Sequence, residues 1–121
     1  SETYLLPGDS VRRVYRLVAS SRKGGTVYFT SAITQDSAAP SLADKLNCKI
    51  WVTGSTAASD GLDGALIYDG PLSGAAASVD IQSGKIPLTY TFQVTLPTDA
   101  NLNYQTLTAG ADFGWRLEVR R

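Results

Sequence analysis

The segment Ile86 to Leu96, "IPLTYTFQVTL", alternates apolar and polar residues more regularly than the rest of the chain. The odd positions from 89 to 95 are Thr or Gln. The even positions are all apolar: Ile86, Leu88, Tyr90, Phe92, Val94 and Leu96. Because successive side chains of a β-strand point to opposite faces, this pattern predicts a strand with one face on a core and the other towards water.

Similar alternation recurs along the chain. Residues 107–119 place these apolar side chains on one face: Leu107, Ala109, Ala111, Phe113, Trp115, Leu117 and Val119. Two shorter segments, 26–34 and 46–53, predict inward rows made of Val27, Phe29, Ser31 and Ile33, and of Leu46, Cys48, Ile50 and Val52. Residues 65–70 and 77–82 read as short strands between Gly-containing turns. Residues 9–20 are apolar on both parities, which allows cover on both faces.

One helical turn is predicted in "PSLADKLN", where Ser41 can cap, Asp44 follows three residues later, and Leu42 and Leu46 turn inward. About seven or eight short strands with tight turns otherwise account for the chain. The pattern therefore predicts an all-β fold, a two-sheet antiparallel sandwich of jelly-roll or immunoglobulin-like type. With 121 residues, the chain is expected to form a single domain spanning residues 1–121.

Composition excludes several classes of function. Eleven basic and eleven acidic residues cancel, so we expect no nucleic-acid partner, and no run approaches the ~20 apolar residues of a membrane span. The absence of histidine excludes a Ser-His-Asp triad, a Cys-His pair and an H-E-x-x-H zinc site within this chain. The carboxylates available for glycoside hydrolysis, Glu2, Glu118 and nine aspartates, have no context that indicates a raised pKa. We therefore expect a non-enzymatic protein with no catalytic residue, metal or cofactor.

Several residues admit both a structural and a functional interpretation. Cys48 is the sole cysteine and is expected to be a small buried residue rather than a reactive thiol. Asp60, Asp63 and Asp69 lie among glycines, where turns are favoured over a calcium site. Outward aromatics are expected at Trp51, Tyr68 and Tyr104, where they can stack on sugars or meet a partner.

Basic residues gather near both ends of the chain. The residues concerned are Arg12, Arg13, Arg16, Arg22 and Lys23 near the start, and Arg116, Arg120 and Arg121 near the end. If the first and last strands are neighbours, the two groups combine into a stripe that can meet an acidic partner or a polysaccharide. The favoured interpretation is that these charges discourage uncontrolled pairing of an edge strand.

Three segments in this order resemble the TasA/camelysin family of secreted biofilm fibre proteins, which includes related archaeal bundling pilins. The segments are "LLPGDSVRRVYRLVAS" (5–20), "SLADKLNCKIWV" (41–52) and "LPTDANLNYQTLTAGADFGWRLEV" (96–119). The resemblance implies a jelly-roll sandwich, secreted to the extracellular space or cell surface, whose subunits form a homopolymer and can also meet other matrix components. In such fibres an N-terminal segment of one subunit adds as a strand to the sheet of the next. The given sequence starts at Ser1 without a Met, which suits a processed product.

Family members carry one or two strands before the Pro-Gly-Asp turn, whereas only six residues precede Pro7 here. Either this segment is the donated strand, with Glu2, Thr3, Tyr4, Leu5 and Leu6 at the subunit interface, or the donor lies outside this chain. The expected acceptor edge is the strand at 9–20, through Val11, Arg13, Tyr15 and Leu17. The competing hypothesis is a carbohydrate-binding or adhesin sandwich module of a cell-surface protein.

Overall fold

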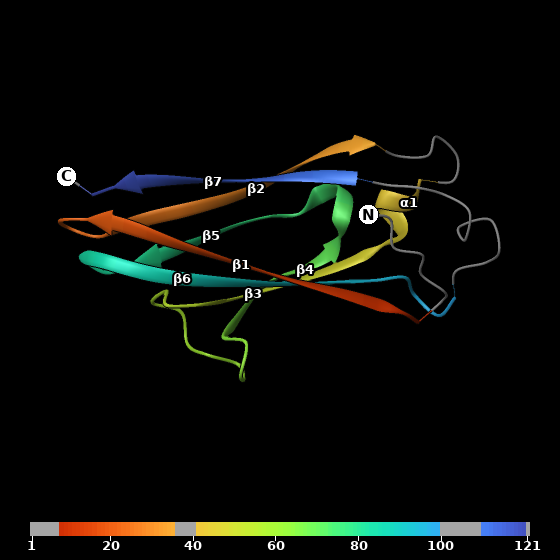
Figure 1. The fold of residues 1–121 in the computed structure, drawn as a ribbon, viewed down its shortest axis with the longest axis horizontal. Coiled ribbons are helices and arrows are strands. Elements are labelled where there is room, and N and C mark those ends of the chain that lie inside the picture. The colour runs from red at the N-terminus through yellow and green to blue at the C-terminus, as the bar shows by residue number, and fades with distance from the viewer. Residues whose placement is uncertain (1–7, 36–40, 100–109, 121) are drawn as a thin grey trace.

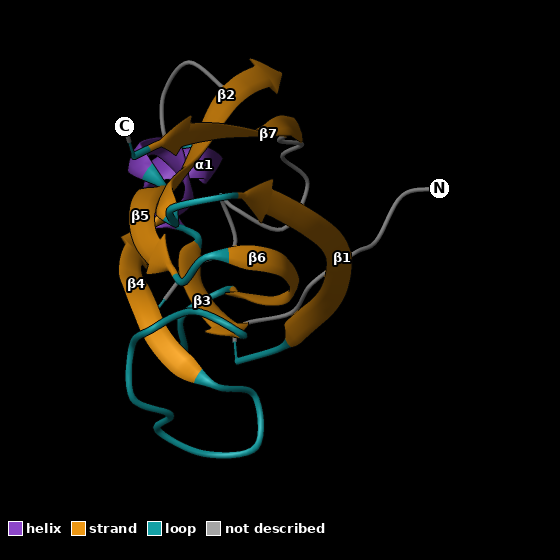
Figure 2. Cartoon of the chain, turned by 90° about the vertical axis from the view of Figure 1, so that its left-hand side faces the viewer, coloured by secondary structure: helices purple, strands orange, loops and turns teal. Residues whose placement is uncertain are grey.

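A computed structural model describes residues 8–35, 41–99 and 110–120. Two antiparallel sheets stack as a sandwich (Figures 1 and 2). The four-stranded sheet has the order β1 (Ser10–Ser21), β6 (Gly84–Thr95), β3 (Asn47–Thr53) and β4 (Ala65–Pro71). The three-stranded sheet has the order β5 (Ala76–Ile81), β2 (Gly25–Gln35) and β7 (Gly110–Val119). The predicted all-β sandwich is confirmed.

The segment "IPLTYTFQVTL" forms most of β6, which lies at the centre of its sheet. β6 pairs with β1 from Ser10↔Thr95 to Ser21↔Gly84 and with β3 on its other side. Its even-numbered side chains face the second sheet, and Leu88, Tyr90 and Phe92 are buried. Pro87 is tolerated in this central strand because β3 ends opposite Thr89, so β6 has a single neighbour at that point.

The core is an aromatic cluster that joins the two sheets. Phe29 of β2 lies with its ring centroid 5.1 Å from that of Phe92 and 6.4 Å from that of Tyr90, both on β6. It also contacts Phe113 at 5.6 Å and Trp115 at 5.5 Å, both on the neighbouring strand β7. Such tilted and edge-on ring pairs add to the stabilisation from buried area. The alternation predicted for β2, β3 and β6 is confirmed, because the apolar members of these inward rows belong to the core cluster or pack against it.

Short helices close one end of the sandwich. In α1 (Leu42–Lys45) the Ser41 hydroxyl accepts a hydrogen bond from the Asp44 amide, and Leu42 and Leu46 are buried, as predicted. The 3-10 helix η1 (Leu72–Gly74) is attached to it, because the Leu72 amide donates to the Leu46 carbonyl at 2.9 Å. No helix in the described ranges is long and apolar enough to cross a membrane.

Cys48 is fully buried on the inward face of β3, as the pattern predicts. Burial raises the pKa of its thiol to about 11, and the carboxylate of Asp69 contributes to the same rise. The thiol therefore stays protonated at neutral pH, and the protonated form is a poor nucleophile.

Phe29→Ala is expected to reduce the free energy of unfolding by about 3–5 kcal/mol, since it opens a cavity at the centre of the aromatic cluster. Thr30→Ala, an exposed neighbour on the same strand, is the matched control and should change it by less than about 0.5 kcal/mol. Chemical denaturation followed by tryptophan fluorescence measures both. Equal losses in the two variants would contradict the central role given to the cluster.

Candidate functional site

Strands β1 and β7 are edge strands on the same side of the sandwich. β1 pairs only with β6, and β7 pairs only with β2. Both strands run towards the same end of the molecule (Figure 1), and the side view places them opposite β4 and β5 (Figure 2). Tyr15 of β1 connects the two edges, with ring centroids 6.0 Å from Phe113 and 5.6 Å from Trp115. The two edge strands therefore lie next to each other and are joined by the Tyr15 ring.

The core is less completely covered along these two strands. Inward side chains of β3 and β6 such as Ile50, Val52 and Leu88 are fully buried. On β1 and β7, by contrast, Ala19 is buried but most inward apolar side chains are only half-buried: Val11, Tyr15, Leu17, Ala111, Phe113, Trp115 and Leu117. We call the edge formed by these seven residues the β1–β7 seam. Because both strands are edges of their sheets, each presents backbone groups with which a further strand could pair.

The backbone of β1 is suited to receive that strand. The Leu96 amide donates to the Asp9 carbonyl at 3.0 Å, which makes Asp9 and Leu96 a hydrogen-bonded position of the antiparallel ladder. Because such positions alternate, the odd-numbered residues of β1 bond to β6, and the amides and carbonyls of even-numbered residues face outward. At this outer edge the Arg13 guanidinium donates to the Arg12 carbonyl at 2.8 Å.

The predicted acceptor residues, Val11, Arg13, Tyr15 and Leu17, lie together on the inward side of edge strand β1. The expectation that this strand can be covered on both faces is wrong, because Val14 and Val18 on its outer side are 46% and 56% exposed. The predicted donor residues, Glu2 to Leu6, lie outside the described part of the chain. The contribution of β7 to the seam was not predicted, since alternation indicates an inward face but not which strand lies across from it.

Two polar atoms are buried beneath the seam. The Tyr90 hydroxyl and the Trp115 indole N–H have no hydrogen-bond partner among the described residues. Burial raises the pKa of the Tyr90 hydroxyl to about 12, and the nearby Trp115 indole N–H lowers that pKa in part. The two groups lie close together but do not meet the geometric criteria of a hydrogen bond. An unpartnered hydroxyl in the core destabilises the fold, because it loses its hydrogen bonds to water on burial.

The aspartates of the loop after β3 do not converge on one point. Asp60 accepts a hydrogen bond from the Leu66 amide at 2.8 Å, Asp63 forms an ion pair with Arg12 at 2.8 Å, and Asp69 belongs to β4. Within the described ranges, no group of three or more acidic or cysteine side chains is placed to hold a metal ion. Asp60 and Asp63 therefore organise the loop and attach it to β1.

The outward aromatics differ from the prediction at one position. Trp51 lies on the outer face as predicted, with the Arg12 guanidinium 5.5 Å from its ring centroid. The prediction for Tyr68 is wrong: its ring packs against the core and its hydroxyl donates to the Pro71 carbonyl at 2.6 Å. A bulge between Ile50 and Trp51 in the β3–β4 pairing makes Ile67 the extra residue and turns Tyr68 inward. Tyr104 lies outside the described residues.

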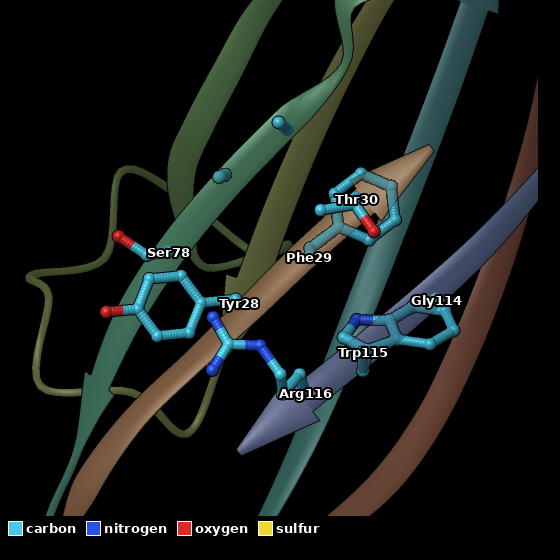
Figure 3. A pocket seen from close by; sticks show the side chains of 9 residues that line it. Tyr28, Phe29, Thr30, Ser78, Gly114, Trp115 and Arg116 are labelled. Carbon is cyan, nitrogen blue, oxygen red and sulfur yellow. The ribbon is translucent and has the colours of Figure 1, made fainter. Parts of the chain in front are cut away.

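A second hollow lies on the outer face of the three-stranded sheet (Figure 3). Its floor is formed by small residues including Ala76 and Gly114, and Tyr28 borders it beneath the Arg116 guanidinium at 4.4 Å. This Tyr28–Arg116 pair was not predicted. Because Tyr28 and Trp51 lie on opposite outer faces, they do not form the aromatic row that would favour sugar binding.

The predicted basic stripe forms only in part. Arg22 and Lys23 of the β1–β2 turn border a hollow together with Arg120, which follows β7. Arg12 is instead paired with Asp63, and Arg116 with Glu118 at 3.1 Å, on different sheets. Arg121 lies outside the described residues.

Comparisons with protein-family models, curated proteins and solved structures find no match to this chain. The seam is therefore the feature from which function is inferred.

The free energy of unfolding is expected to fall as the pH rises through the ionisation range of Tyr90. Its pKa rises from 10.0 in the unfolded chain to about 12 in the fold, so the fold favours the neutral hydroxyl over the ionised one. The stability that depends on this neutral form is complete below pH 10 and is lost between pH 10 and about 12. Two pKa units correspond to about 2.7 kcal/mol. Tyr90→Phe should remove this part of the alkaline loss, as measured by urea denaturation from pH 8 to 12. Parallel pH profiles for both proteins would contradict the assignment.

Proposed function

We propose that this protein is a structural subunit of an extracellular filament and that subunits polymerise by adding a strand of one copy to the sandwich of the next. The observation that carries the proposal is the β1–β7 seam. There, half-buried aromatic and aliphatic side chains lie next to an edge strand of twelve residues. The resemblance to TasA/camelysin fibre proteins, on the three segments quoted above, supports the same function.

Addition of a strand beside β1 pairs unpaired backbone groups and covers partly exposed apolar side chains. The outward amides and carbonyls of β1 gain partners, and the inward row of the added strand covers Tyr15, Leu17 and Trp115. The segment Glu2 to Leu6 is the proposed donor, since it is long enough to pair with about half of β1. Donation from each copy to the next does not close on itself, and such head-to-tail contacts produce an open filament.

The competing function, a carbohydrate-binding or adhesin module, has weaker support. Trp51 and Tyr28 are only partly exposed, on opposite outer faces, and each is covered in part by an arginine side chain. An isolated aromatic ring can contact one sugar unit, whereas a polysaccharide platform needs several rings on one face. Glycan binding by a protein that stays monomeric at all concentrations would favour this alternative.

Val14→Pro tests the proposed acceptor edge. The Val14 amide faces away from β6, so proline should preserve the β1–β6 pairing and remove one hydrogen bond offered to an added strand. A partner carbonyl left unpaired costs about 1–3 kcal/mol, which weakens assembly about 5- to 150-fold. Light scattering and negative-stain microscopy of the full chain measure assembly, and chemical denaturation measures the stability of the fold.

Val14→Thr is the matched control, because it keeps the amide and the shape of the side chain. It should assemble like the unmodified protein. If Val14→Pro folds normally and forms filaments as readily as the control, β1 is not the acceptor edge.

A further inference from the structure

The two ends of the sandwich carry opposite charges, although the whole chain has a net charge of zero. At one end, on the left in Figure 1, the β1–β2 turn, the start of β6 and the residue after β7 come together. This basic end has four exposed cations: Arg22, Lys23, Lys85 and Arg120. The acids nearest to it point along the outer sheet face, where Asp80 accepts a hydrogen bond from Thr26 at 2.8 Å and Glu118 pairs with Arg116.

The opposite end contains α1, the residues before β1 and after β6, and the start of β7 (Figure 1). This acidic end has four exposed carboxylates: Asp9, Asp44, Asp99 and Asp112. Lys45 lies among them and pairs with Asp99 at 3.0 Å. Arg12 and Arg13, the third and fourth residues of β1, lie as near to this end as Asp112, and Arg12 is already paired with Asp63. Among the described residues at this end, the four carboxylates therefore outnumber the two remaining cations, Lys45 and Arg13, and they complement the four cations of the basic end.

The β1–β7 seam opens at the basic end. The hollow there is lined by Ser21 at the end of β1 and by Val119 and Arg120 at the end of β7, together with the β1–β2 turn. The Arg120 amide donates to the Gly24 carbonyl at 3.0 Å and so holds the end of β7 against the turn. A strand that enters the seam from this end passes between the basic side chains.

The direction of β1 limits how a second copy can supply that strand. β1 starts at the acidic end, where the Gly8 amide donates to the Leu96 carbonyl, so residues 1–7 join the fold at the acidic end. A copy whose acidic end rests on the basic end of its neighbour thus has its first residues at the mouth of the neighbour's seam. If these first residues extend along the neighbour's seam, their residue numbers increase towards the neighbour's basic end. β1 of the neighbour runs in the same direction, so the two strands are parallel.

We propose that copies of this chain stack end to end, acidic end on basic end, with residues 2–6 of one copy paired parallel to β1 of the next. This inference rests on the proposed function, in which residues 2–6 are the donated strand. In the register we propose, Glu2 lies beside Arg13, Tyr4 beside Tyr15 and Leu6 beside Leu17. The register places one ion pair and two apolar pairs along the inward side of the seam, since alternate residues share a face.

The antiparallel alternative is disfavoured by charge. A donor that runs antiparallel to β1 would bring the acidic ends of two copies together, where the carboxylates repel one another. Two copies facing each other in this way could also exchange strands reciprocally and form a closed dimer rather than a filament. End-to-end stacking in one direction avoids both outcomes and repeats without limit.

Reversal of the charges at each end tests the stacking. Arg22→Glu/Lys23→Glu/Lys85→Glu copies, and separately Asp44→Lys/Asp99→Lys/Asp112→Lys copies, should lose assembly at ~0.1 M salt, where charges interact over about 10 Å. An equimolar mixture should assemble, because each altered end then meets an end of opposite charge. Thr30→Glu/Ser78→Glu adds two glutamates on the exposed outer face of the three-stranded sheet and serves as the control that assembles normally.

The register is tested by disulfide formation between differently labelled copies. Copies with Glu2→Cys, mixed with copies carrying Arg13→Cys, should form a crosslinked dimer under mild oxidation. Copies with Glu2→Cys, mixed with copies carrying Leu17→Cys, should not, although an antiparallel donor would bring these two positions together. Cys48 is buried and remains outside the reaction.

Each outcome separates this inference from the proposed function. If the unmodified chain does not assemble, the proposed function fails and the stacking with it. If it assembles, but the reversed copies assemble equally well or the mixture stays unassembled, the end-to-end stacking alone is wrong. A crosslink at Leu17 instead of Arg13 would overturn the parallel register and leave strand donation intact.

Discussion

The sandwich depends on the contact between Phe29 of one sheet and Tyr90 and Phe92 of the other. This contact continues sideways through Phe113 and Trp115, whose rings are only half-buried. The cluster that holds the sheets together therefore ends at the seam rather than inside the molecule. A strand added at the seam extends the same apolar cluster, so the interactions that fold one subunit are continuous with those proposed to join it to the next.

Much of this arrangement could be predicted from alternation alone, because burial on one face imposes a period of two on a strand. The rows of β3 and β6 were predicted correctly, including buried Cys48 and outward Trp51. Tyr68 was not, since the bulge after Ile50 changes which residues of β4 face the core, and a bulge leaves little trace in a short strand. Only the β1 half of the seam could be predicted, from the alternating apolar residues of that strand. The position of β1 beside β7 depends on the order of strands in the two sheets, which alternation does not reveal.

The distribution of charged residues is a second feature that the sequence alone does not reveal. The equal numbers of acidic and basic residues give a net charge of zero, yet they conceal a separation of charge that exists only after folding. Turns distant in sequence bring Lys85 and Arg120 beside Arg22, while α1 brings Asp44 to the opposite end. Under the proposed stacking, this distribution provides a directional attraction between copies at short range.

Arg13 connects edge protection with assembly. In a single copy its guanidinium bonds to the outward Arg12 carbonyl at 2.8 Å and so occupies a position where another strand would pair. A charged side chain over an edge strand discourages indiscriminate pairing, because a foreign strand must displace it and leave the charge without a partner. In the proposed register, Glu2 of the added strand supplies that partner. Under that proposal the same arginine excludes strands in general and admits the one whose sequence compensates its charge.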